Sequence, residues 1–336
     1  MKEIRIGLIG AGRIGKVHAE AIGTQATAEL VAVSDVNLPA AQALASKWHV
    51  SKVYQGYRPI LDDPSVDAVA ICSSTDTHAQ IIIEAAQAGK HIFCEKPIDY
   101  SLVKIDAALE AVDKAAVKLT VGFNRRFDPN FRRVQELVSS GAIGTPRILR
   151  ITSRDPAPPP IEYIKVSGGI FLDMTIHDFD MARFLIGSEV TQVFVAGGVM
   201  VDSKIGEAGD LDTAITTLWF ANGAIGTIDN CREAAYGYDQ RVEVFGSLGM
   251  AQAENNTPDR HILSTHEAVS SAKPLYFFLE RYMEAYKTEM SAFTEAVLNH
   301  APLSVTGMDG RAPVAIGLAA MKSYQEGRVV KIEEVH

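Results

Sequence analysis

The chain has 336 residues, and its 32 Lys and Arg against 41 Asp and Glu give a formal net charge of −9. A net-acidic protein has no general attraction to a polyphosphate backbone, so we expect no nucleic-acid partner. The sequence shows no signal peptide, no apolar run long enough to span a bilayer, and three cysteines without the spacing of a disulfide framework or zinc site, so we expect a cytoplasmic protein with no membrane partner and no metal.

The first 123 residues alternate short apolar runs with helix-like segments. The apolar runs cover residues 4–9, 30–34, 66–72, 91–94 and 119–123. The helix-like segments cover residues 14–22, 40–48, 77–88 and 101–115. This alternation predicts an α/β fold with a doubly wound parallel sheet of the Rossmann type, covered on both faces. We therefore predict one domain over residues 1–123.

The pattern changes after residue 123. The segments that look helical cover residues 130–139, 172–186, 276–300 and 311–326. A strand is expected over 147–152, and four prolines between residues 156 and 160 predict a stiff loop. Residues 190–253 are mostly strand-like, with turn signals at 221–223 and 246–249. We predict a second domain over residues 124–336, built on a largely antiparallel sheet.

A glycine-rich hexamer follows the first predicted strand. Gly10, Gly12 and Gly15 form the pattern G-x-G-x-x-G, with Arg13 and Ile14 inside it. The first glycine permits a tight turn, the second lets the backbone approach a pyrophosphate, and the third lets helix and strand pack closely. The pyrophosphate would lie at the helix N-terminus, where free N–H groups favour an anion. We predict a dinucleotide site; the alternative is a Rossmann-like domain with a vestigial site.

Asp35 follows the second predicted strand, about 20 residues after the last glycine of the motif. At that place an acidic side chain accepts hydrogen bonds from the ribose hydroxyls and repels a 2′-phosphate. Val36 and Asn37 beside it offer no cation to such a phosphate. The sequence therefore predicts NAD rather than NADP as the cofactor.

Polar residues also follow the apolar run 66–72, at the sheet edge where open α/β folds bind ligands. Ser73, Thr75 and His78 are candidate cofactor contacts, because polar groups there can bond ribose or phosphate. The threonines here could instead cap the following helix, and the two roles are compatible.

The triplet Glu95-Lys96-Pro97 follows the apolar run 91–94 at the same edge. Lysine is normally exposed, so a lysine at the end of a buried strand is unusual. An ammonium there can bind a reacting hydroxyl and stabilise negative charge on its oxygen. We predict that Lys96 is catalytic and that Glu95 and Lys96 also contact the cofactor. The alternative is a surface lysine on a turn.

A polar stripe lies on the predicted helix over residues 172–186. At 100° per residue, Asp173, His177 and Asp180 fall within about 60° of one another. Histidine titrates near neutrality, and a carboxylate one turn away can fix its tautomer. The stripe predicts that His177 is a general base oriented by Asp173. The alternative is a core histidine bonded to a neighbouring carboxylate.

The glycine hexamer, the Glu95-Lys96-Pro97 triplet and the Gly-Gly-x-x-x-Asp-x-x-x-His segment at 168–177 together resemble the glucose–fructose oxidoreductase / inositol dehydrogenase family. The segments similar to its inositol dehydrogenase members cover residues 121–128, 152–156, 176–184 and 236–240. The resemblance implies a nicotinamide-binding Rossmann domain and a C-terminal α/β domain with a large open sheet, mainly antiparallel, through which a homotetramer assembles.

The resemblance also assigns roles to individual residues. It implies that Lys96, Asp173 and His177 carry catalysis. The residues that it implies in polyol contacts are Arg126, Asp155, Asp180 and Tyr238, with Tyr236 as the alternative to Tyr238.

The activity that the resemblance implies is the NAD-dependent oxidation of myo-inositol, within inositol catabolism. The axial hydroxyl becomes the ketone of 2-keto-myo-inositol, with the hydride passing to NAD and the proton to His177. A ring of hydroxyls needs many donors and acceptors, which these residues could supply. The near alternative is a dehydrogenase for scyllo-inositol or for an aldose such as glucose. The distant one is a non-catalytic protein that senses NAD.

Overall fold

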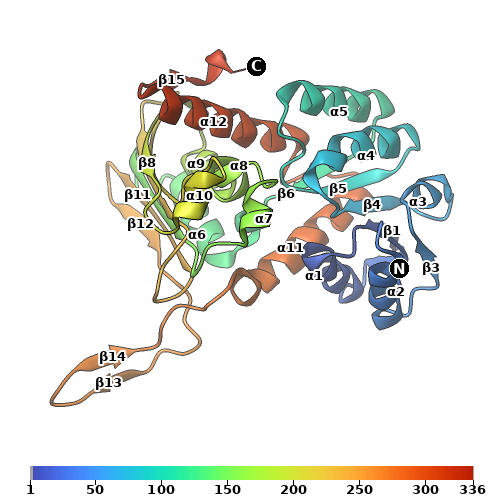
Figure 1. Ribbon diagram of the computed structural model, residues 1–336, viewed down its shortest axis with the longest axis horizontal. Coiled ribbons are helices and arrows are strands. Elements are labelled where there is room, and N and C mark those ends of the chain that lie inside the picture. Colours follow the sequence, from blue (N-terminus) through green and yellow to red (C-terminus); the bar gives the residue numbers. More distant parts are fainter. Residues whose placement is uncertain (1–2, 336) are drawn as a thin grey trace. The chain divides into compact units, whose positions relative to one another are not determined.

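The structure is a computed structural model that describes residues 3–335 (Figure 1). The chain forms two compact units. The first takes in the chain up to Phe127 together with Met283–Val314, and the second takes in Asp128–Tyr282 and the chain from Ala315 onward. The two domains predicted from the sequence, residues 1–123 and residues 124–336, stay a prediction.

The first unit contains a six-stranded sheet in the order β3-β2-β1-β4-β5-β6. Every neighbouring pair in it is parallel. The strands are β1 (Ile4–Ile9), β2 (Ala28–Ser34), β3 (Lys52–Tyr54), β4 (Ala68–Ile71), β5 (His91–Glu95) and β6 (Leu119–Gly122). This is the strand order of a dinucleotide-binding Rossmann fold. From β1 the chain builds the sheet outward to β3 on one side, and then returns to build β4 to β6 on the other side of β1. The predicted doubly wound parallel sheet is confirmed.

Helices cover both faces of this sheet. They are α1 (Arg13–Gly23), α2 (Leu38–Lys47), α3 (Arg58–Asp62), α4 (Thr75–Gln87) and α5 (Leu102–Ala115). On one face, alternate residues of β1 pack against α1 and α2 and against Met290, Phe293 and Val297 of the long helix α11 (Phe278–Leu298). On the other face, Gly7 lies so close to Ile60 that an added Cβ would come within 2.3 Å of it. The unit also holds the short 3-10 helix η1 (Asn124–Phe127).

The second unit contains a seven-stranded sheet in the order β12-β11-β7-β10-β9-β8-β15. The strands are β7 (Pro146–Arg154), β8 (Val190–Gly198), β9 (Thr213–Phe220), β10 (Ile225–Cys231), β11 (Asp239–Gly246), β12 (Met250–Ala253) and β15 (Val330–Lys331). All neighbouring pairs are antiparallel except β10 and β7. The turn signals at 221–223 and 246–249 lie between β9 and β10 and between β11 and β12, so the predicted sheet is confirmed.

Helices α6 (Pro129–Ser139) and α9 (Ile176–Ile186) pack on one face of the second sheet. The remaining helical segments are α7 (Ile161–Ile164), α8 (Gly169–Asp173), α10 (Ser203–Glu207), α12 (Gly307–Glu326) and η2 (Ile332–Glu334). A two-stranded hairpin, β13 (Ile262–Ser264) with β14 (Val269–Ser271), extends away from the sheet on a long connection (Figure 1). The sequence analysis did not predict this hairpin.

The single helix predicted over residues 172–186 is wrong, because the structure breaks it into α8 and α9 at Met174 and Thr175. The Thr175 N–H donates to Ile170 O, five residues back, so the regular bonding pattern is lost at this point. The Thr175 hydroxyl donates to Asn230 Oδ1 of β10 at 2.8 Å. A buried bond to the sheet thus competes with helix continuation, and no helical periodicity in the sequence reveals it.

Candidate active site

The glycine loop has the geometry that a dinucleotide pyrophosphate requires. Gly10 has a φ of +103°, and a Cβ added there would lie 2.4 Å from the Cys72 carbonyl oxygen. A Cβ on Gly15 would lie 2.0 Å from the Gly10 carbonyl oxygen. A Cβ on Gly12 would meet nothing within 4 Å. The first and third glycines are therefore fixed by packing, while the second leaves open space at the start of α1, and this loop fits NAD.

Asp35 is held beside this loop by two backbone N–H groups. Ala11 N donates to Asp35 Oδ2 at 2.6 Å and Asn37 N donates to Asp35 Oδ1 at 2.7 Å. Val36 is 86% exposed, so the chain turns outward directly after the carboxylate. Arg13 is exposed and Ile14 is half-buried at the start of α1. The structure thus brings the predicted ribose-binding carboxylate to the glycine loop.

The end of β4 carries the second group of predicted cofactor contacts. The Ser73 and Thr77 hydroxyls lie 2.7 Å apart, and the Thr77 hydroxyl donates to Ser74 O at 2.7 Å. Helix α4 begins at Thr75 with Ser74 at the N-cap, and no side chain caps it. The helix-capping alternative for the threonines is therefore wrong, and a cofactor contact at Ser73 or Thr75 stays a prediction.

His78 lies on the first turn of α4 and is buried. Its Nδ1 lies 2.8 Å from Pro97 O and its Nε2 lies 3.0 Å from Ser73 O. The ring therefore joins the loop after β4 to the loop after β5. A contact of this ring with the cofactor stays a prediction.

The triplet at the end of β5 is more enclosed than a surface turn. Glu95 is the last residue of the strand and is buried, and Lys96 is half-buried. The Lys96–Pro97 peptide bond is cis. Glu95 Oε1 lies 2.6 Å from His18 Nε2, and Glu95 Oε2 accepts a bond from Lys96 N at 3.2 Å. The exposed-lysine alternative does not describe this arrangement.

The second unit holds Asp173 at the end of α8 by two donors. Tyr163 Oη donates to Asp173 Oδ1 at 2.8 Å, and Arg232 Nη1 donates to Asp173 Oδ2 at 3.3 Å. Arg232 is 1% exposed and also pairs with Asp210 at 3.6 Å. Asp210 in turn accepts a bond from Ile170 N at the start of α8. Tyr163 and Arg232 therefore hold the Asp173 carboxylate directly, and Asp210 contributes through Arg232.

His177 and Asp180 both lie on α9, where His177 is half-buried and Asp180 is fully buried. The helix is interrupted between α8 and α9, so Asp173 lies on a different helix from His177 and Asp180. The predicted stripe, which placed all three within about 60° on one helix, is therefore wrong. Only His177 and Asp180 remain on one helix, at a spacing of three residues.

Asn230 on β10 joins the α8–α9 turn to the sheet. Its Oδ1 accepts the Thr175 hydroxyl, and its Nδ2 donates to Asp178 Oδ2 at 2.9 Å and to Ser153 O at 3.3 Å. Asp178 is fully buried on α9. This network ties the start of α9, the helix that carries His177, to the sheet.

The predicted polyol contacts fall in both units. In the first, Arg126 is buried and pairs with Asp309 at 3.0 Å. In the second, Asp155 follows β7 and its N–H donates to Cys231 O at 3.0 Å. Tyr238 is buried, with its ring edge-on to that of Tyr282 at 6.0 Å.

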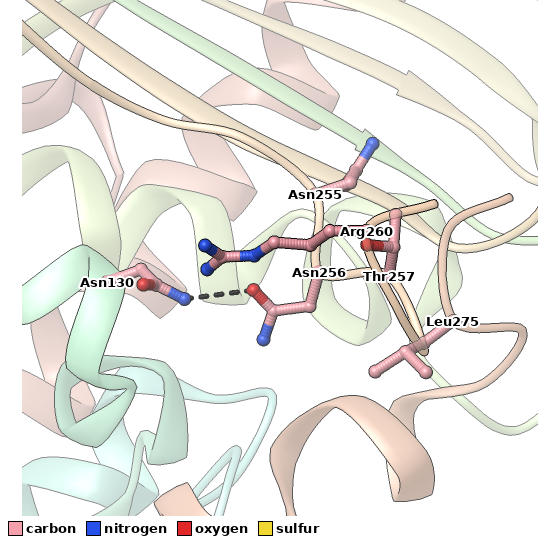
Figure 2. A pocket seen from close by; sticks show the side chains of 6 residues that line it. All are labelled: Asn130, Asn255, Asn256, Thr257, Arg260 and Leu275. Carbon is pink, nitrogen blue, oxygen red and sulfur yellow. Dashed lines mark hydrogen bonds between the residues drawn. The ribbon is translucent and has the colours of Figure 1, made fainter. Parts of the chain in front are cut away.

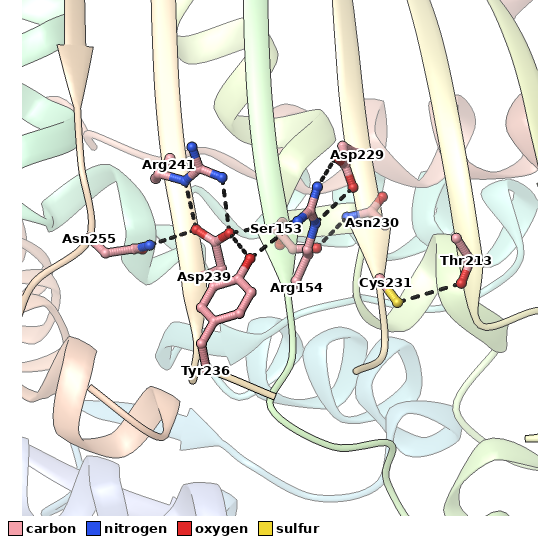
Figure 3. Close-up of polar contacts among 10 residues, drawn as sticks. All are labelled: Ser153, Arg154, Thr213, Asp229, Asn230, Cys231, Tyr236, Asp239, Arg241 and Asn255. Atoms are coloured by element: carbon pink, nitrogen blue, oxygen red, sulfur yellow. Dashed lines mark hydrogen bonds and ion pairs between the residues drawn. The ribbon is translucent and has the colours of Figure 1, made fainter. Parts of the chain in front are cut away.

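Tyr236, the alternative to Tyr238, belongs to a charged network that crosses β10, β7 and β11 (Figure 3). Arg154 pairs with Asp229, and the Tyr236 hydroxyl donates to Asp239. Burial, and then the bond to Asp239, raises the pKa of Tyr236. Burial acts against the charged form of Asp239, but bonds from Arg241 and from Tyr236 outweigh it and lower the pKa of that carboxyl. The Tyr236 hydroxyl is thus bonded to Arg154 and Asp239, and neither of these residues lies on α9, the helix that carries His177.

A separate cavity of about 390 Å³ opens in the second unit (Figure 2). Its lining residues are Asn130, Asn255, Asn256, Thr257, Arg260 and Leu275. Asn130 Nδ2 donates to Asn256 Oδ1 across it at 3.0 Å. No predicted site residue is among the described residues that line this cavity.

Sequence reasoning missed Tyr163, Arg232 and Asn230, the residues that hold Asp173 and the α8–α9 turn. Arg232 directly follows β10 and is 1% exposed, but the sequence marks neither the end of that strand nor the burial of the charge. Tyr163 and Asn230 carried no pattern that distinguishes them from other loop and strand residues.

Residues 3–335 contain no group of three or more His, Cys, Asp or Glu side chains arranged to hold a metal ion. Over the same residues, no helix combines the length and the apolarity needed to cross a membrane.

Comparisons with known proteins agree with a dinucleotide-binding site in the first unit. Residues 4–123 match the oxidoreductase family with an NAD-binding Rossmann fold, and residues 131–252 match the GFO/IDH/MocA C-terminal domain. The chain is 51% identical to the myo-inositol 2-dehydrogenase of Thermotoga maritima over 332 residues, which cover 99% of each chain.

Solved structures give the same result. A myo-inositol dehydrogenase from Corynebacterium glutamicum is 39% identical, with a TM-score of 0.93 and 98% of each chain covered. A scyllo-inositol dehydrogenase from Lactobacillus casei, solved with NAD(H) and scyllo-inositol, is 30% identical, with a TM-score of 0.93 over 99% of this chain and 100% of that one. The chain is thus an oxidoreductase that uses NAD, and it belongs to the GFO/IDH/MocA family, the glucose–fructose oxidoreductase / inositol dehydrogenase family.

Proposed function

We propose that this protein oxidises myo-inositol at its axial hydroxyl, giving 2-keto-myo-inositol and NADH. The observation that carries the proposal is a half-buried Lys96 at the carboxyl end of a Rossmann strand, in a chain 51% identical to a myo-inositol 2-dehydrogenase over nearly its full length. Inositol catabolism is the pathway context that follows from it.

In the proposed reaction, three side chains act on the substrate hydroxyl. The Lys96 ammonium binds the reacting oxygen and favours its negative character. His177 accepts the hydroxyl proton, and Asp173 stabilises the imidazolium that forms. NAD, when bound, accepts the hydride from the substrate carbon. Because Tyr163 and Arg232 fix the Asp173 carboxylate, this group would need little reorganisation as charge develops on His177.

For the remaining polyol contacts, we propose Arg126, Asp155, Asp180 and Tyr238. A ring of hydroxyls presents both donors and acceptors, so an arginine, two carboxylates and a phenol can each take a partner. A ligand that leaves any of these groups unpaired would bind much more weakly, which gives stereochemical selectivity. Arg126 is already oriented by Asp309, which supports its place in this set.

For NAD we propose contacts from two sets of residues. The glycine-loop set is Gly10, Gly12, Arg13, Ile14 and Gly15, with Asp35 on the ribose. The set at the ends of β4 and β5 is Ser73, Thr75, His78, Glu95 and Lys96. We assign the NAD-binding role to residues 1–123, and substrate binding and assembly to 124–336.

The second candidate is oxidation of scyllo-inositol, supported by the 30%-identical relative solved with that isomer. An aldose such as glucose is a further candidate of the same chemical class. The inositol isomers differ in the orientation of their hydroxyls, and an aldose differs in its ring, but each reaction oxidises a ring hydroxyl, so the same catalytic groups would serve each of them.

The deciding experiment measures NADH formation with a panel of inositol isomers and aldoses. We expect the highest kcat/KM with myo-inositol. A preference for scyllo-inositol or glucose would replace the substrate, and no NADH from any polyol would favour a non-catalytic protein that senses NAD.

The catalytic roles are tested by Lys96→Ala and His177→Ala. Each should lower kcat by about 100-fold or more, since each removes a group that acts in the transition state. NAD binding, measured by calorimetry, should be largely retained, because both variants keep the glycine loop and Asp35, and Lys96 is only one of the proposed NAD contacts. Turnover close to wild type in either variant would remove that residue from the mechanism.

We also propose a cytoplasmic homotetramer that assembles through the seven-stranded sheet. One face of this sheet packs under α6 and α9, while the other carries Ile215, Ile225 and Phe245, each more than 40% exposed. A second copy of the chain would cover these side chains.

A further inference from the structure

We propose that two buried histidines, His18 and His78, are positioning residues that hold the catalytic loop around Lys96. The inference rests on the proposed role of Lys96 but not on which polyol is the substrate. Both histidines belong to the first unit, on the helices that follow β1 and β4.

His18 lies on α1, three residues after the last glycine of the dinucleotide loop. Its side chain is fully buried, and its Nε2 lies 2.6 Å from Glu95 Oε1. A carboxylate only accepts, so His18 Nε2 is the donor in this bond. The other ring nitrogen, Nδ1, is buried and has no hydrogen-bond partner among the described residues. The ring therefore forms a single strong bond, and that bond is directed at the residue before Lys96.

The Glu95 carboxylate is confined on its other side by the neighbouring strand. A Cβ added to Gly122 on β6 would lie 3.2 Å from all three atoms of the carboxyl group. The second oxygen, Oε2, accepts the backbone N–H of Lys96 at 3.2 Å. Through this carboxylate, His18 fixes the backbone at Lys96 itself.

His78 holds the residue on the other side of Lys96. Its Nδ1 lies 2.8 Å from Pro97 O and its Nε2 lies 3.0 Å from Ser73 O. Carbonyl oxygens only accept, so the ring donates to the catalytic loop, to the loop after β4, or to both. Lys96 is thus flanked by two residues, Glu95 and Pro97, each of which contacts a buried histidine.

A purely structural role would not account for this placement. An aliphatic side chain could fill the space of His18 without leaving Nδ1 buried and unpaired, which is a cost in stability. Each ring contacts one of the two residues that adjoin Lys96, His18 contacting Glu95 and His78 contacting Pro97. A displacement of about 1 Å in a reacting group can cost about 100-fold in rate, so restraint of this loop has a direct effect on catalysis.

The experiment compares His18→Leu and His78→Leu with the variants His18→Gln and His78→Asn. The amide nitrogens of Gln and Asn reproduce the donors at Nε2 and Nδ1, whereas leucine fills the space without donating. We expect kcat to fall about 10- to 100-fold in the leucine variants. In His18→Leu, which removes no proposed cofactor contact, the KM for the polyol and the Kd for NAD should change less than about 3-fold. The amide variants of both histidines should recover most of kcat.

The matched control is His91→Leu. His91 lies at the opposite end of the same strand, β5, and its Nδ1 accepts the Lys118 N–H at 3.1 Å. This variant should leave kcat unchanged. Wild-type kcat in both leucine variants, or amide variants as impaired as the leucine ones, would overturn the proposal.

A second readout does not depend on turnover. Hydrogen exchange, followed by mass spectrometry, reports on the Lys96 amide that is bonded to Glu95. Exchange in the peptide containing Lys96 should be faster in His18→Leu, restored in His18→Gln and unchanged in His91→Leu. If wild-type enzyme oxidises no polyol, the proposed function fails while this measurement still tests the restraint. Unchanged exchange in His18→Leu would overturn the restraint even in an active enzyme.

Discussion

Some carboxylates in this protein are held by backbone N–H groups. Asp35 is the clearest case, since Ala11 N and Asn37 N hold its two oxygens beside the glycine loop. A fixed negative charge at this place favours the ribose hydroxyls of NAD and repels a 2′-phosphate.

We expect Asp35→Ser to lower the preference for NAD over NADP by about 10-fold or more, because it removes the repulsion and the acceptor together. The measurement is kcat/KM for the two cofactors at saturating polyol. Asp113→Ser, at an exposed position on α5, serves as the control. An unchanged cofactor ratio would show that Asp35 does not set the preference.

Two of the three cysteines are packing residues at the ends of Rossmann strands. Cys72 and Cys94 are buried, and burial, followed by the nearby Glu95 carboxylate, raises the pKa of both thiols well above the ordinary value. Thiols react with alkylating reagents as thiolates, so these two should be inert in the folded protein.

We expect iodoacetamide at about pH 8 to label Cys231 first, since Cys231 is only partly buried. Cys72 and Cys94 should be labelled only after unfolding in denaturant. Peptide mass spectrometry with and without denaturant measures this. Labelling of Cys72 or Cys94 at the rate of Cys231 in native protein would contradict their burial.

At the scale of elements, backbone turns are fixed by buried polar side chains. The α8–α9 break depends on Asn230, and the turn after β8 depends on Asp212. The Asp212 carboxylate is fully buried and accepts N–H bonds from Met200 and Val201, both at 2.8 Å, and from Asp202 at 3.1 Å. Burial acts against its charge, but these bonds outweigh it and lower the pKa of Asp212.

We expect Asp212→Asn to lower the free energy of unfolding by about 2 kcal/mol at pH 7, since an amide accepts fewer of these bonds. A carboxyl with a lowered folded-state pKa stabilises above its unfolded pKa of about 3.9, and that stabilisation is lost as the pH falls through the folded value. The difference between wild type and variant should therefore shrink below about pH 4. Urea titrations at several pH values measure it. Asp113→Asn is the control, and a difference that persists at low pH would contradict the assignment.

At the scale of the whole molecule, the seven-stranded sheet has one packed and one open face. Strand register aligns Met250, Phe245, Ile148, Ile225 and Trp219 in a row across five strands. Next to this row, Arg150 pairs with Glu243 at 3.2 Å. Apolar side chains in a continuous row, beside complementary charges, suit the self-complementary interface of a homo-oligomer.

We expect Ile225→Asp to shift the assembly from the proposed tetramer to a smaller species, because an unpaired carboxylate at the proposed interface would be desolvated. Light scattering coupled to size-exclusion chromatography measures the mass. Val103→Asp is the control, since Val103 is an isolated exposed residue on α5 of the first unit. An unchanged mass for Ile225→Asp would place the interface elsewhere.

Much of the fold could be predicted because the signals are local. The apolar run 4–9, the glycine hexamer and the helix after them follow from periodicity and from the spacing of Gly10, Gly12 and Gly15. The β13–β14 hairpin escaped prediction because its six residues are all exposed and carry no alternation between a buried and an exposed face. Among the site residues, strand ends pointed to Asp35 and Lys96, whereas Arg232 and Asn230 act through partners distant in the chain.

The sequence by itself determined the parallel, doubly wound Rossmann sheet, the NAD-binding loop and the residue types available for catalysis, since short-range sterics and hydrophobic period decide these. Only the tertiary structure decided where the helix carrying His177 begins, which donors hold Asp173, and that His18 and His78 contact the neighbours of Lys96. These are bonds between residues tens of positions apart, such as His18 with Glu95 and Thr175 with Asn230. A buried polar group must find a partner wherever the packed core offers one, and that choice has no local signature in the chain.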